Sequence, residues 1–374
     1  MAKSRRFEEL DIARALPLLL LPVVHVYEEM ESIDSLPESI VTNNEWILTL
    51  CTLMPSIFMI FLGANIVFSS RTTAKSLFVR GWKMLGVGLL LDVVRFGIPI
   101  TSYCIVNQDW TDFFDEFLYY TAVSDIYDFV GLAFLAFALF KKLDLSKMKM
   151  FVIAAVLLIA DMLIPNFSTG NDFVDAILGC FIWMNEDSCF NFMQWLIFPV
   201  IGYIFGDLYK NFATEDDRKC FVKKMLGVSV VGLIGMWFSL ASYGIDPLLV
   251  ITSPMNEYIT DIPNVIMLVF EAGIWVALVY FAYMKFKDAK VTRFLVNISK
   301  SIMTYYVVQW VIIGWIEYFI NGFAPDESFP QFTTLSFWLT IVGTIVLSVV
   351  ITLAYAKFKE NRKAKKLAAQ PVAA

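Results

Sequence analysis

The chain is dominated by apolar runs of the length that crosses a lipid bilayer. A spanning helix needs about 20 largely apolar residues, and ten segments come close to this length: 10–30, 46–69, 80–100, 122–140, 149–165, 191–209, 222–243, 262–284, 302–321 and 334–357. Apolar residues make up 58% of the sequence and the mean hydropathy is +0.67, which is more apolar surface than a soluble domain could bury. We therefore predict an all-α, polytopic membrane protein with about ten transmembrane helices.

The positive charges predict how these helices are oriented. Lysine and arginine occur near both ends of the chain and in every second loop, whereas the five other loops contain neither and carry acidic residues such as Asp34, Asp109 and Asp172. Because Lys and Arg accumulate on the cytoplasmic side of a membrane, we expect both termini in the cytoplasm and the acidic loops outside. The alternation also supports the number of segments, since one missed helix would exchange the two sides.

The sequence shows neither an internal repeat nor a soluble domain. We expect residues 1–360 to form one membrane domain, and 361–374 to form a basic, disordered cytoplasmic tail. The basic residues are scattered over short loops without an extended basic domain, so nucleic-acid binding is not expected.

The first predicted span carries a group of polar residues in an apolar run. His25 is the only histidine of the chain, and Asp11 and Arg14 precede it. On a helix, Arg14 and His25 fall about 20° apart around the axis and roughly 16 Å apart along it, so they share one side. Ionisable groups inside a spanning helix are costly, which favours a functional role. The alternative for His25 is a packing role, with a hydrogen bond to a neighbouring helix.

Carboxylates accompany both His25 and Arg14. Glu28 and Glu29 follow His25 by three and four residues, and a carboxylate at that spacing can orient an imidazole and raise its basicity. A general base acting on a hydroxyl or an amine requires this. Asp11 and Arg14 are three residues apart, which fits a self-neutralising pair near the cytoplasmic interface and equally a group that orients an anionic donor.

Further polar residues mark later spans. Arg80 and Lys83 stand at the cytoplasmic mouth of the third span, where they would reach lipid head groups or bind phosphate. Asp92 and Arg95 lie deeper, as a structural ion pair or as part of a polar cavity. The other intramembrane polar residues, several of them toward the outer half, indicate a cavity that opens outward: Asp125, Asp128, Asp161, Glu271, Gln309 and Glu317.

Several of these stretches resemble the transmembrane acyltransferases, which include the acyltransferase-3 proteins and the heparan-alpha-glucosaminide N-acetyltransferase-like proteins. Arg14, ten further residues and His25, preceded by the dipeptide LD, are similar to the Arg-x10-His signature of that superfamily. Arg80-x-x-Lys83 resembles the basic pair that opens the third helix of its members. IFMIFLGANIVFSS resembles their second helix, and ISKSIMTYYVVQW a late Ser-Leu-x-x-Tyr pattern.

The resemblance implies a multi-pass acyltransferase of the cell membrane. Its donor would be cytoplasmic acyl-CoA, usually acetyl-CoA, and its acceptor a hydroxyl or amine of an extracytoplasmic sugar or glycan. The protein would contact membrane lipid, would use no metal, and could form an oligomer. The resemblance makes His25 the central catalytic residue and gives Arg14, Arg80 and Lys83, with Asp11 beside Arg14, a role in donor binding.

Three residues depart from the superfamily pattern. Leu62 stands where many relatives carry Ser, and Asp128 and Gln309 stand where some carry His. These differences leave the acceptor open, and they leave a non-catalytic relative as one alternative. A transporter or flippase with a polar midplane site is another, although the two halves of the chain show no matching broken helices. Direct attack by the acceptor and an acetyl-histidine intermediate are both compatible with the sequence.

Overall fold

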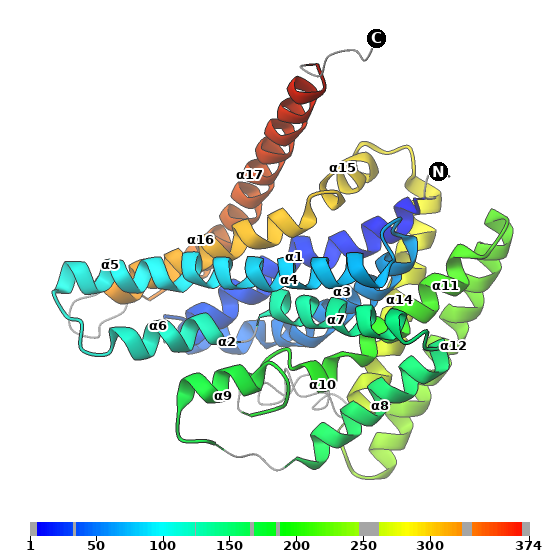
Figure 1. The fold of residues 1–374 in the computed structure, drawn as a ribbon, viewed down its shortest axis with the longest axis horizontal. Helices are drawn as coiled ribbons and strands as arrows, with labels where there is room; N and C mark the ends of the chain where they lie inside the picture. The colour runs from blue at the N-terminus through cyan, green and yellow to red at the C-terminus, as the bar shows by residue number, and fades with distance from the viewer. Residues whose placement is uncertain are drawn as a thin grey trace.

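The computed structural model describes residues 6–32, 35–123, 125–164, 168–184, 188–246, 262–323 and 331–368. Every regular element within these ranges is a helix (Figure 1). The helices follow the chain as α1 (Glu8–Ser32), α2 (Glu38–Asn44), η1 (Glu45–Ile47), α3 (Leu48–Phe68), α4 (Ala74–Asp92), η2 (Val93–Gly97), α5 (Ile98–Asn107), α6 (Phe113–Ala122), α7 (Ile126–Lys142), α8 (Lys147–Leu163), α9 (Asp172–Gly179), α10 (Phe192–Trp195), α11 (Ile197–Lys210), α12 (Glu215–Ser242), α14 (Ile262–Phe286), α15 (Lys290–Ser299), α16 (Ile302–Phe323) and α17 (Thr334–Ala368).

Within the described ranges, six helical runs are long and apolar enough to cross a membrane: Glu8–Glu31, Ala74–Asn107, Phe192–Lys210, Glu215–Ser242, Ile262–Phe286 and Thr334–Lys365. A seventh arises if α6 and α7, which are bent by 48°, are counted together. Each of the ten predicted segments coincides with a helix, but α3, α8 and α16 are not among these seven candidates. The all-helical class is therefore confirmed for the described residues, with six to seven candidate spans.

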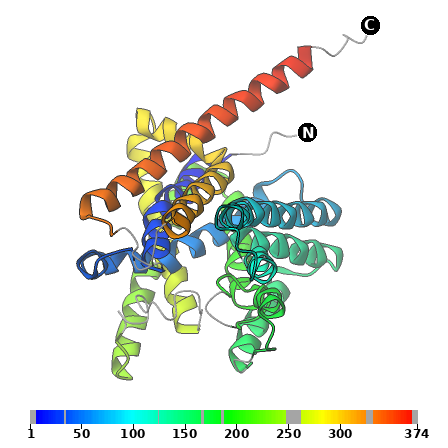
Figure 2. The same ribbon diagram turned by 90° about the vertical axis from the view of Figure 1, so that its left-hand side faces the viewer.

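The α1 helix lies at the centre of the fold. Of its most apolar 18-residue window, 78% is buried, against 11% for α12 and 28% for α17. It packs against α3, α14, α15, α16 and α17. Figure 2 shows α17, in red, projecting from the other helices toward the C-terminus. The candidate residues on α1 therefore lie inside the protein, whereas α12 and α17 present apolar side chains at its periphery.

Two prolines interrupt the hydrogen bonding of α1, and neighbouring helices compensate. Pro17 has no N–H to donate to the carbonyl of Ala13, and the indole Nε1 of Trp275 donates to that carbonyl at 2.8 Å. Next to the carbonyl that Pro22 leaves without a donor, the hydroxyl of Tyr305 donates to the carbonyl of Leu19 at 2.9 Å. These contacts place α14 and α16 against α1 and satisfy polar backbone groups that a membrane cannot solvate.

Close backbone contact fixes α3 against α11. A Cβ on Gly63 would stand 1.8 Å from the carbonyl oxygen of Pro199, and one on Gly202 would stand 1.7 Å from that of Ile60. Only glycine permits this approach, a common basis of helix packing in membranes.

The predicted tail and two of the acidic loops are described only in part. Residues 361–368 continue α17 as a helix, and 369–374 lie outside the described residues. Asp34, which we assigned to an acidic outer loop, also lies outside them, as do Glu186 and Asp187 of the loop that contains Asp172.

Candidate active site

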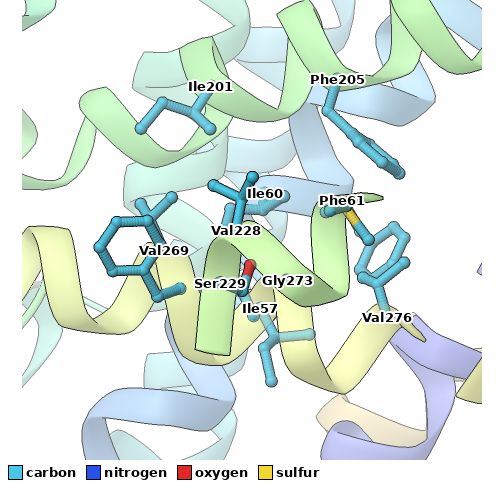
Figure 3. Close-up of a pocket in the computed structure, with 13 residues that line it drawn as sticks. Ile57, Ile60, Phe61, Ile201, Phe205, Val228, Ser229, Val269, Gly273 and Val276 are labelled. Carbon is cyan, nitrogen blue, oxygen red and sulfur yellow. The ribbon is translucent and has the colours of Figure 1, made fainter. Parts of the chain in front are cut away.

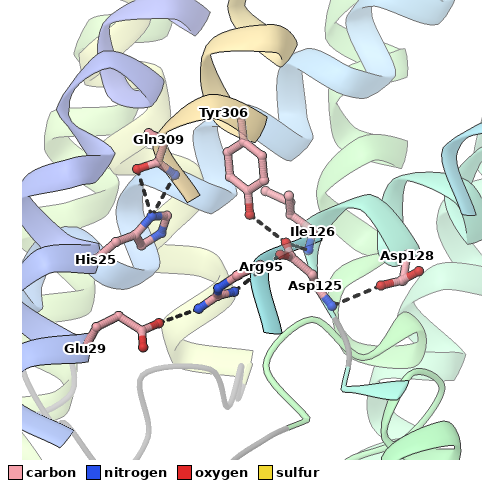
Figure 4. A network of polar contacts seen from close by, with 8 residues as sticks. All are labelled: His25, Glu29, Arg95, Asp125, Ile126, Asp128, Tyr306 and Gln309. Carbon is pink, nitrogen blue, oxygen red and sulfur yellow. Dashed lines mark hydrogen bonds and ion pairs between the residues drawn. The ribbon is translucent and has the colours of Figure 1, made fainter. Parts of the chain in front are cut away.

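His25 is buried in the centre of the protein, with 8% of its surface exposed. Its Nδ1 lies 3.2 Å from Oε1 and 2.9 Å from Nε2 of Gln309 on α16 (Figure 4). The ring stacks on Trp310, with centroids 3.8 Å apart and planes 17° apart. Within the described part of the chain, Nε2 of His25 has no hydrogen-bond partner. The imidazole is thus held through Nδ1 and the Trp310 ring, and Nε2 is the nitrogen that remains for a substrate.

The Gln309 amide can support either neutral form of His25. If Oε1 of Gln309 faces Nδ1, the imidazole carries its proton on Nδ1 and presents a lone pair at Nε2. If the amide nitrogen donates to Nδ1, the proton is on Nε2. A half-turn of the amide together with a change of imidazole tautomer therefore converts Nε2 between a base and a donor, and the first arrangement also stabilises an imidazolium.

Arg95 joins α1 to the start of α7. Its guanidinium lies 2.5 Å from Oε1 of Glu29 and 3.9 Å from Oδ2 of Asp125, and its Cζ lies 3.4 Å from the centroid of the Trp310 ring. Only 8% of the Arg95 side chain is exposed. The guanidinium and the imidazole thus contact the same indole ring, and Arg95 is the positive centre of this network.

The carboxylates of Asp125 and Asp128 organise the beginning of α7. Asp125 Oδ1 accepts from the hydroxyl of Tyr306 at 2.5 Å and from the N–H of Ile126. Asp128 accepts from the N–H of Asp125 at 3.2 Å, which completes a capping box. Asp128 therefore helps to fix Asp125, the N-cap residue of α7, which contacts Arg95 and Tyr306.

Of the two alternatives for Asp92 and Arg95, an ion pair or part of a polar cavity, the ion pair does not form among the described residues, where the carboxylate partners of Arg95 are Glu29 and Asp125. The cause is local geometry, because Arg95 lies in the π-helical turn η2, which is wider than an α-turn and changes where the side chain points. The indole of Trp315 donates to the carbonyl of Val94 in this turn at 3.0 Å. Asp92 is buried, within electrostatic range of Asp125.

Glu28 and Glu29, which we expected to orient His25, are placed differently. Glu29 contacts Arg95, and the Nδ1 of His25 contacts Gln309. Glu28 is half-buried on α1. The orienting group is therefore an amide on a distant helix, although Gln309 itself was among the predicted cavity residues.

Two residues of α16 escaped the sequence analysis. Tyr306 and Trp310 contact Asp125 and His25, and with Gln309 they occupy one face of the helix. Glu317 lies on the same face and within electrostatic range of Arg95. The spacing of three and four residues from Tyr306 to Gln309 and Trp310 was the sequence feature that could have placed these side chains on one face of the helix.

Arg14 lies at the other end of α1. It donates to the carbonyl of Ser299 at 3.0 Å and lies 3.6 Å from Oδ1 of Asp11, which also pairs with Arg6. Ser299 ends α15, directly before α16, the helix that contacts His25. Arg14 therefore contacts α15 and His25 contacts α16, the next helix along the chain, and the shared side of α1 stays a prediction from their spacing.

Arg80 and Lys83 lie on α4, apart from Arg14 and Asp11. The Cζ of Arg80 stands 4.3 Å from the centroid of the Phe134 ring, and Lys83 is exposed. Among the described residues, neither forms a hydrogen bond or ion pair with Asp11 or Arg14. The structure thus brings together His25, Glu29, Arg95, Asp125, Asp128 and Gln309, and it does not join the predicted donor-binding residues into one cluster.

Two cavities lie elsewhere in the described structure. One of about 210 Å³ lies between α3, α11, α12 and α14 and is almost entirely apolar, with Ser229 and Gly273 among side chains such as Phe61 (Figure 3). Another of about 480 Å³ lies between α6 and the start of α9. The apolar cavity offers no acid–base group, so the network around His25 is the candidate active site.

An all-helical protein with membrane-length apolar helices, built around a buried imidazole, guanidinium and carboxylates, belongs to the class of multi-pass membrane proteins with an internal polar site. Its sequence matches the profile of the heparan-alpha-glucosaminide N-acetyltransferase catalytic family over residues 6–247, well over half of its 374 residues. The chain therefore belongs to this family, as its motifs predicted, and membership indicates a membrane acetyltransferase. No curated protein and no solved structure matches the chain.

Proposed function

We propose that the protein transfers an acetyl group from cytoplasmic acetyl-CoA to a hydroxyl or amine of an extracytoplasmic carbohydrate. One observation carries the proposal. The only histidine of the chain is buried with Nδ1 held by Gln309, and its Nε2 has no partner within the described residues. This is the arrangement that a general base requires, because the nitrogen that takes the proton must be open to the substrate.

The reaction balances with His25 as the proton carrier. Nε2 takes the proton of the acceptor hydroxyl or amine while the acceptor atom forms a bond to the acetyl carbon. The carbon–sulfur bond of the thioester breaks, and the imidazolium returns its proton to the departing thiolate. Gln309 Oε1, facing Nδ1, accepts a hydrogen bond throughout and stabilises the positive ring.

The donor would approach the Arg14 end of α1. Arg14 is 20% exposed, and its Nε is buried without a hydrogen-bond partner among the described residues, so the guanidinium retains a donor for an anionic ligand. Arg80 and Lys83 lie apart from Arg14, on α4, and in this proposal they bind phosphates of the donor there, while Asp11 holds Arg14 in place. Roughly 16 Å of helix separates Arg14 from His25, a distance that the extended part of an acyl-CoA would span.

The acceptor would approach from the His25 end. Arg95, Asp125 and Asp92 are buried there, and Nε of Arg95 and Oδ2 of Asp125, which have no hydrogen-bond partner among the described residues, suit the hydroxyls of a sugar. In this proposal both termini are cytoplasmic, about ten helices cross the cell membrane, and the first 360 residues form one domain. The basis is the alternation of lysine- and arginine-containing loops with acidic loops, together with a helix at each predicted segment.

The decisive experiment compares the wild-type protein with His25→Ala and His25→Gln. The purified proteins would receive acetyl-CoA and a panel of amino sugars and neutral sugars, with thiol release and acetylated product as readouts. We expect both variants to lose about 10²- to 10⁴-fold in transfer rate. His25→Gln retains an amide beside Gln309 but cannot take a proton, so it separates base catalysis from packing.

Donor binding serves as the control for folding. Acetyl-CoA should raise the apparent melting temperature of His25→Gln as it does that of the wild type, because ligand binding stabilises the folded state by mass action. A variant that binds the donor and still transfers acetyl at more than a tenth of the wild-type rate would rule out His25 as the base.

A further inference from the structure

We propose that the apolar cavity between α3, α11, α12 and α14 binds one acyl chain of an anionic membrane phospholipid, whose phosphate contacts Lys224 at the mouth of the cavity. The inference goes beyond acetyl transfer, because the lipid would support the packing of α12 and would take no part in the proposed reaction. It uses the membrane topology proposed above, in which the Lys224 end of α12 lies at the cytoplasmic face.

The cavity lies where α12 separates from α3 and α11. At its start, α12 meets the end of α11 through Phe221, whose ring lies 6.2 Å from that of Phe205 and 5.0 Å from that of Phe212. Further along, α12 packs closely on α14, where a Cβ on Gly232 would stand 2.3 Å from Cζ of Phe270. The helix therefore keeps α14 as its close neighbour and leaves a space toward α3 and α11 (Figure 3).

The lining of this space favours an apolar occupant over water. Ser229 supplies the one side-chain hydroxyl, and the other described lining residues are apolar or glycine. A buried water needs two to four polar partners, so a cavity of this kind stays dry. Its volume is about 210 Å³, and an apolar cavity of roughly 150 Å³ already accommodates benzene. The cavity therefore has room for several methylene groups of an acyl chain.

The cavity opens toward the bilayer beside Val228. This residue lines the cavity and has 65% of its surface exposed, whereas Ser229 next to it is 4% exposed. Because α12 is a candidate membrane span with little of its apolar surface buried, the surface around Val228 meets hydrocarbon. The apolar groups that reach this mouth are therefore the acyl chains of membrane lipids.

A positive charge beside the mouth indicates which headgroup fits. Lys224 is exposed and precedes Val228 by four residues, so the two side chains lie on one side of α12, about 6 Å apart along its axis. A lysine near the end of a span extends its ammonium group toward the lipid headgroups. An anionic phospholipid offers only its phosphate there, whereas the choline of a zwitterionic lipid brings a competing positive charge. Charge complementarity thus favours the anionic lipid.

A bound chain would complete the packing of α12. Apolar side chains that border an unfilled space, such as Phe61 of α3 and Ile201 of α11, lose dispersion contacts on that side. A lipid chain in the cavity would supply these contacts and connect α12 to α3 and α11. Because the lipid binds the folded protein, it should also raise the stability by mass action.

The direct test uses the full-length protein in detergent and a phosphatidylglycerol with a photoreactive diazirine midway along one chain. Mass spectrometry should find the label on Phe61 and Val276, two buried lining residues that lipid around the outside of the protein does not reach. Unlabelled phosphatidylglycerol should compete about fivefold better than phosphatidylcholine with the same chains, the difference that one lysine near the membrane surface provides. Labelling confined to other residues, or equal competition by the two lipids, would overturn the proposal.

A pair of variants tests the entry of the chain. Val228→Phe should obstruct the mouth and lower the labelling of the buried lining residues by about tenfold or more. Val231→Phe is the matched control, because Val231 is 71% exposed on the same helix and does not line the cavity. Both positions are exposed, so the fold should tolerate either phenylalanine. Labelling that persists in Val228→Phe, or that falls equally in the control, would show that the chain does not enter beside Val228 and would refute the site.

A second pair of variants tests the headgroup contact. Lys224→Gln should weaken competition by phosphatidylglycerol about fivefold and leave that by phosphatidylcholine unchanged. Lys223→Gln is the control, because this exposed lysine lies about 100° away around the helix. Phosphatidylglycerol should also raise the apparent melting temperature more than phosphatidylcholine does in the wild type and in Lys223→Gln, but not in Lys224→Gln. Equal behaviour of the two variants would contradict the proposal, and neither readout depends on acetyl transfer.

Discussion

The two polar ends of α1 are built in different ways. At the His25 end, side chains contact one another across helices: His25 contacts Gln309, and Glu29 contacts Arg95. At the Arg14 end, the guanidinium uses a backbone carbonyl and a carboxylate three residues away. The first arrangement depends on the identity of several distant side chains, whereas the second depends on a backbone carbonyl of α15 and on a carboxylate of its own turn of helix.

Exposure differs in the same direction. The Arg95 and Asp125 side chains are 8% and 9% exposed, whereas Arg14 is 20% and Arg6 43% exposed. Water therefore screens charges at the Arg14 end more than at the His25 end. The two ends should therefore respond differently to the loss of a charged side chain. At the His25 end we expect a loss of stability, and at the Arg14 end a loss of ligand affinity.

The largest effect is expected from Arg95→Gln. Removing this guanidinium leaves the carboxylates of Glu29 and Asp125 buried without their cation, and breaking a buried ion pair from one side costs about 3–5 kcal/mol. Equilibrium unfolding in a denaturing detergent would measure the loss. Combining Arg95→Gln with Glu29→Gln should recover part of it, because the uncompensated charge is removed as well. If Arg95→Gln were no more destabilising than Arg14→Gln, the contrast between the two ends would be invalid.

A smaller effect is expected from crowding the same residue. A Cβ on Gly314 of α16 would stand 2.7 Å from Cγ of Arg95, and that side chain has little freedom to move because Glu29 and Trp310 hold it. Gly314→Ala should therefore destabilise the protein by about 1–3 kcal/mol and reduce acetyl transfer. Gly343→Ala is the control, since a Cβ there meets no atom within 4 Å. Equal unfolding curves for the two variants would show that α16 does not pack tightly on Arg95.

The sequence predicts much of the fold because apolar length and charge alternation are local properties. The ten predicted segments are helical, and an ideal helical period predicts that Arg14 and His25 share one side of α1. The ion-pair alternative for Asp92 and Arg95 assumed an α-helix across a turn that is π-helical, and that pair does not form among the described residues. Pro99 follows this turn closely, and because proline cannot donate a backbone hydrogen bond, it indicates a departure from regular α-helical hydrogen bonding there.

The partners of His25 could be predicted only in part. Gln309 is 284 residues away along the chain, so its pairing with Nδ1 depends on how α16 packs against α1 and not on any local pattern. Glu29, four residues from His25, was the nearer choice by spacing, but Arg95 contacts it instead. Local rules therefore found the ionisable residues and Gln309 but missed Tyr306 and Trp310, and tertiary packing determined which of these residues meet.

The smallest effect is expected from Arg14→Gln, and it should appear in affinity. Arg14 is partly exposed, and Asp11 keeps a second partner in Arg6, so the loss of stability should be at most about 1 kcal/mol. If Arg14 binds the donor in the ground state and the transition state alike, KM for acetyl-CoA should rise about five- to tenfold while kcat stays near the wild-type value. Steady-state kinetics at varied acetyl-CoA would measure both, with Arg71→Gln, an exposed arginine outside this group, as control. A fall in kcat at unchanged KM would instead place Arg14 in the transfer step, and the division of labour between the two ends of α1 would then have to be abandoned.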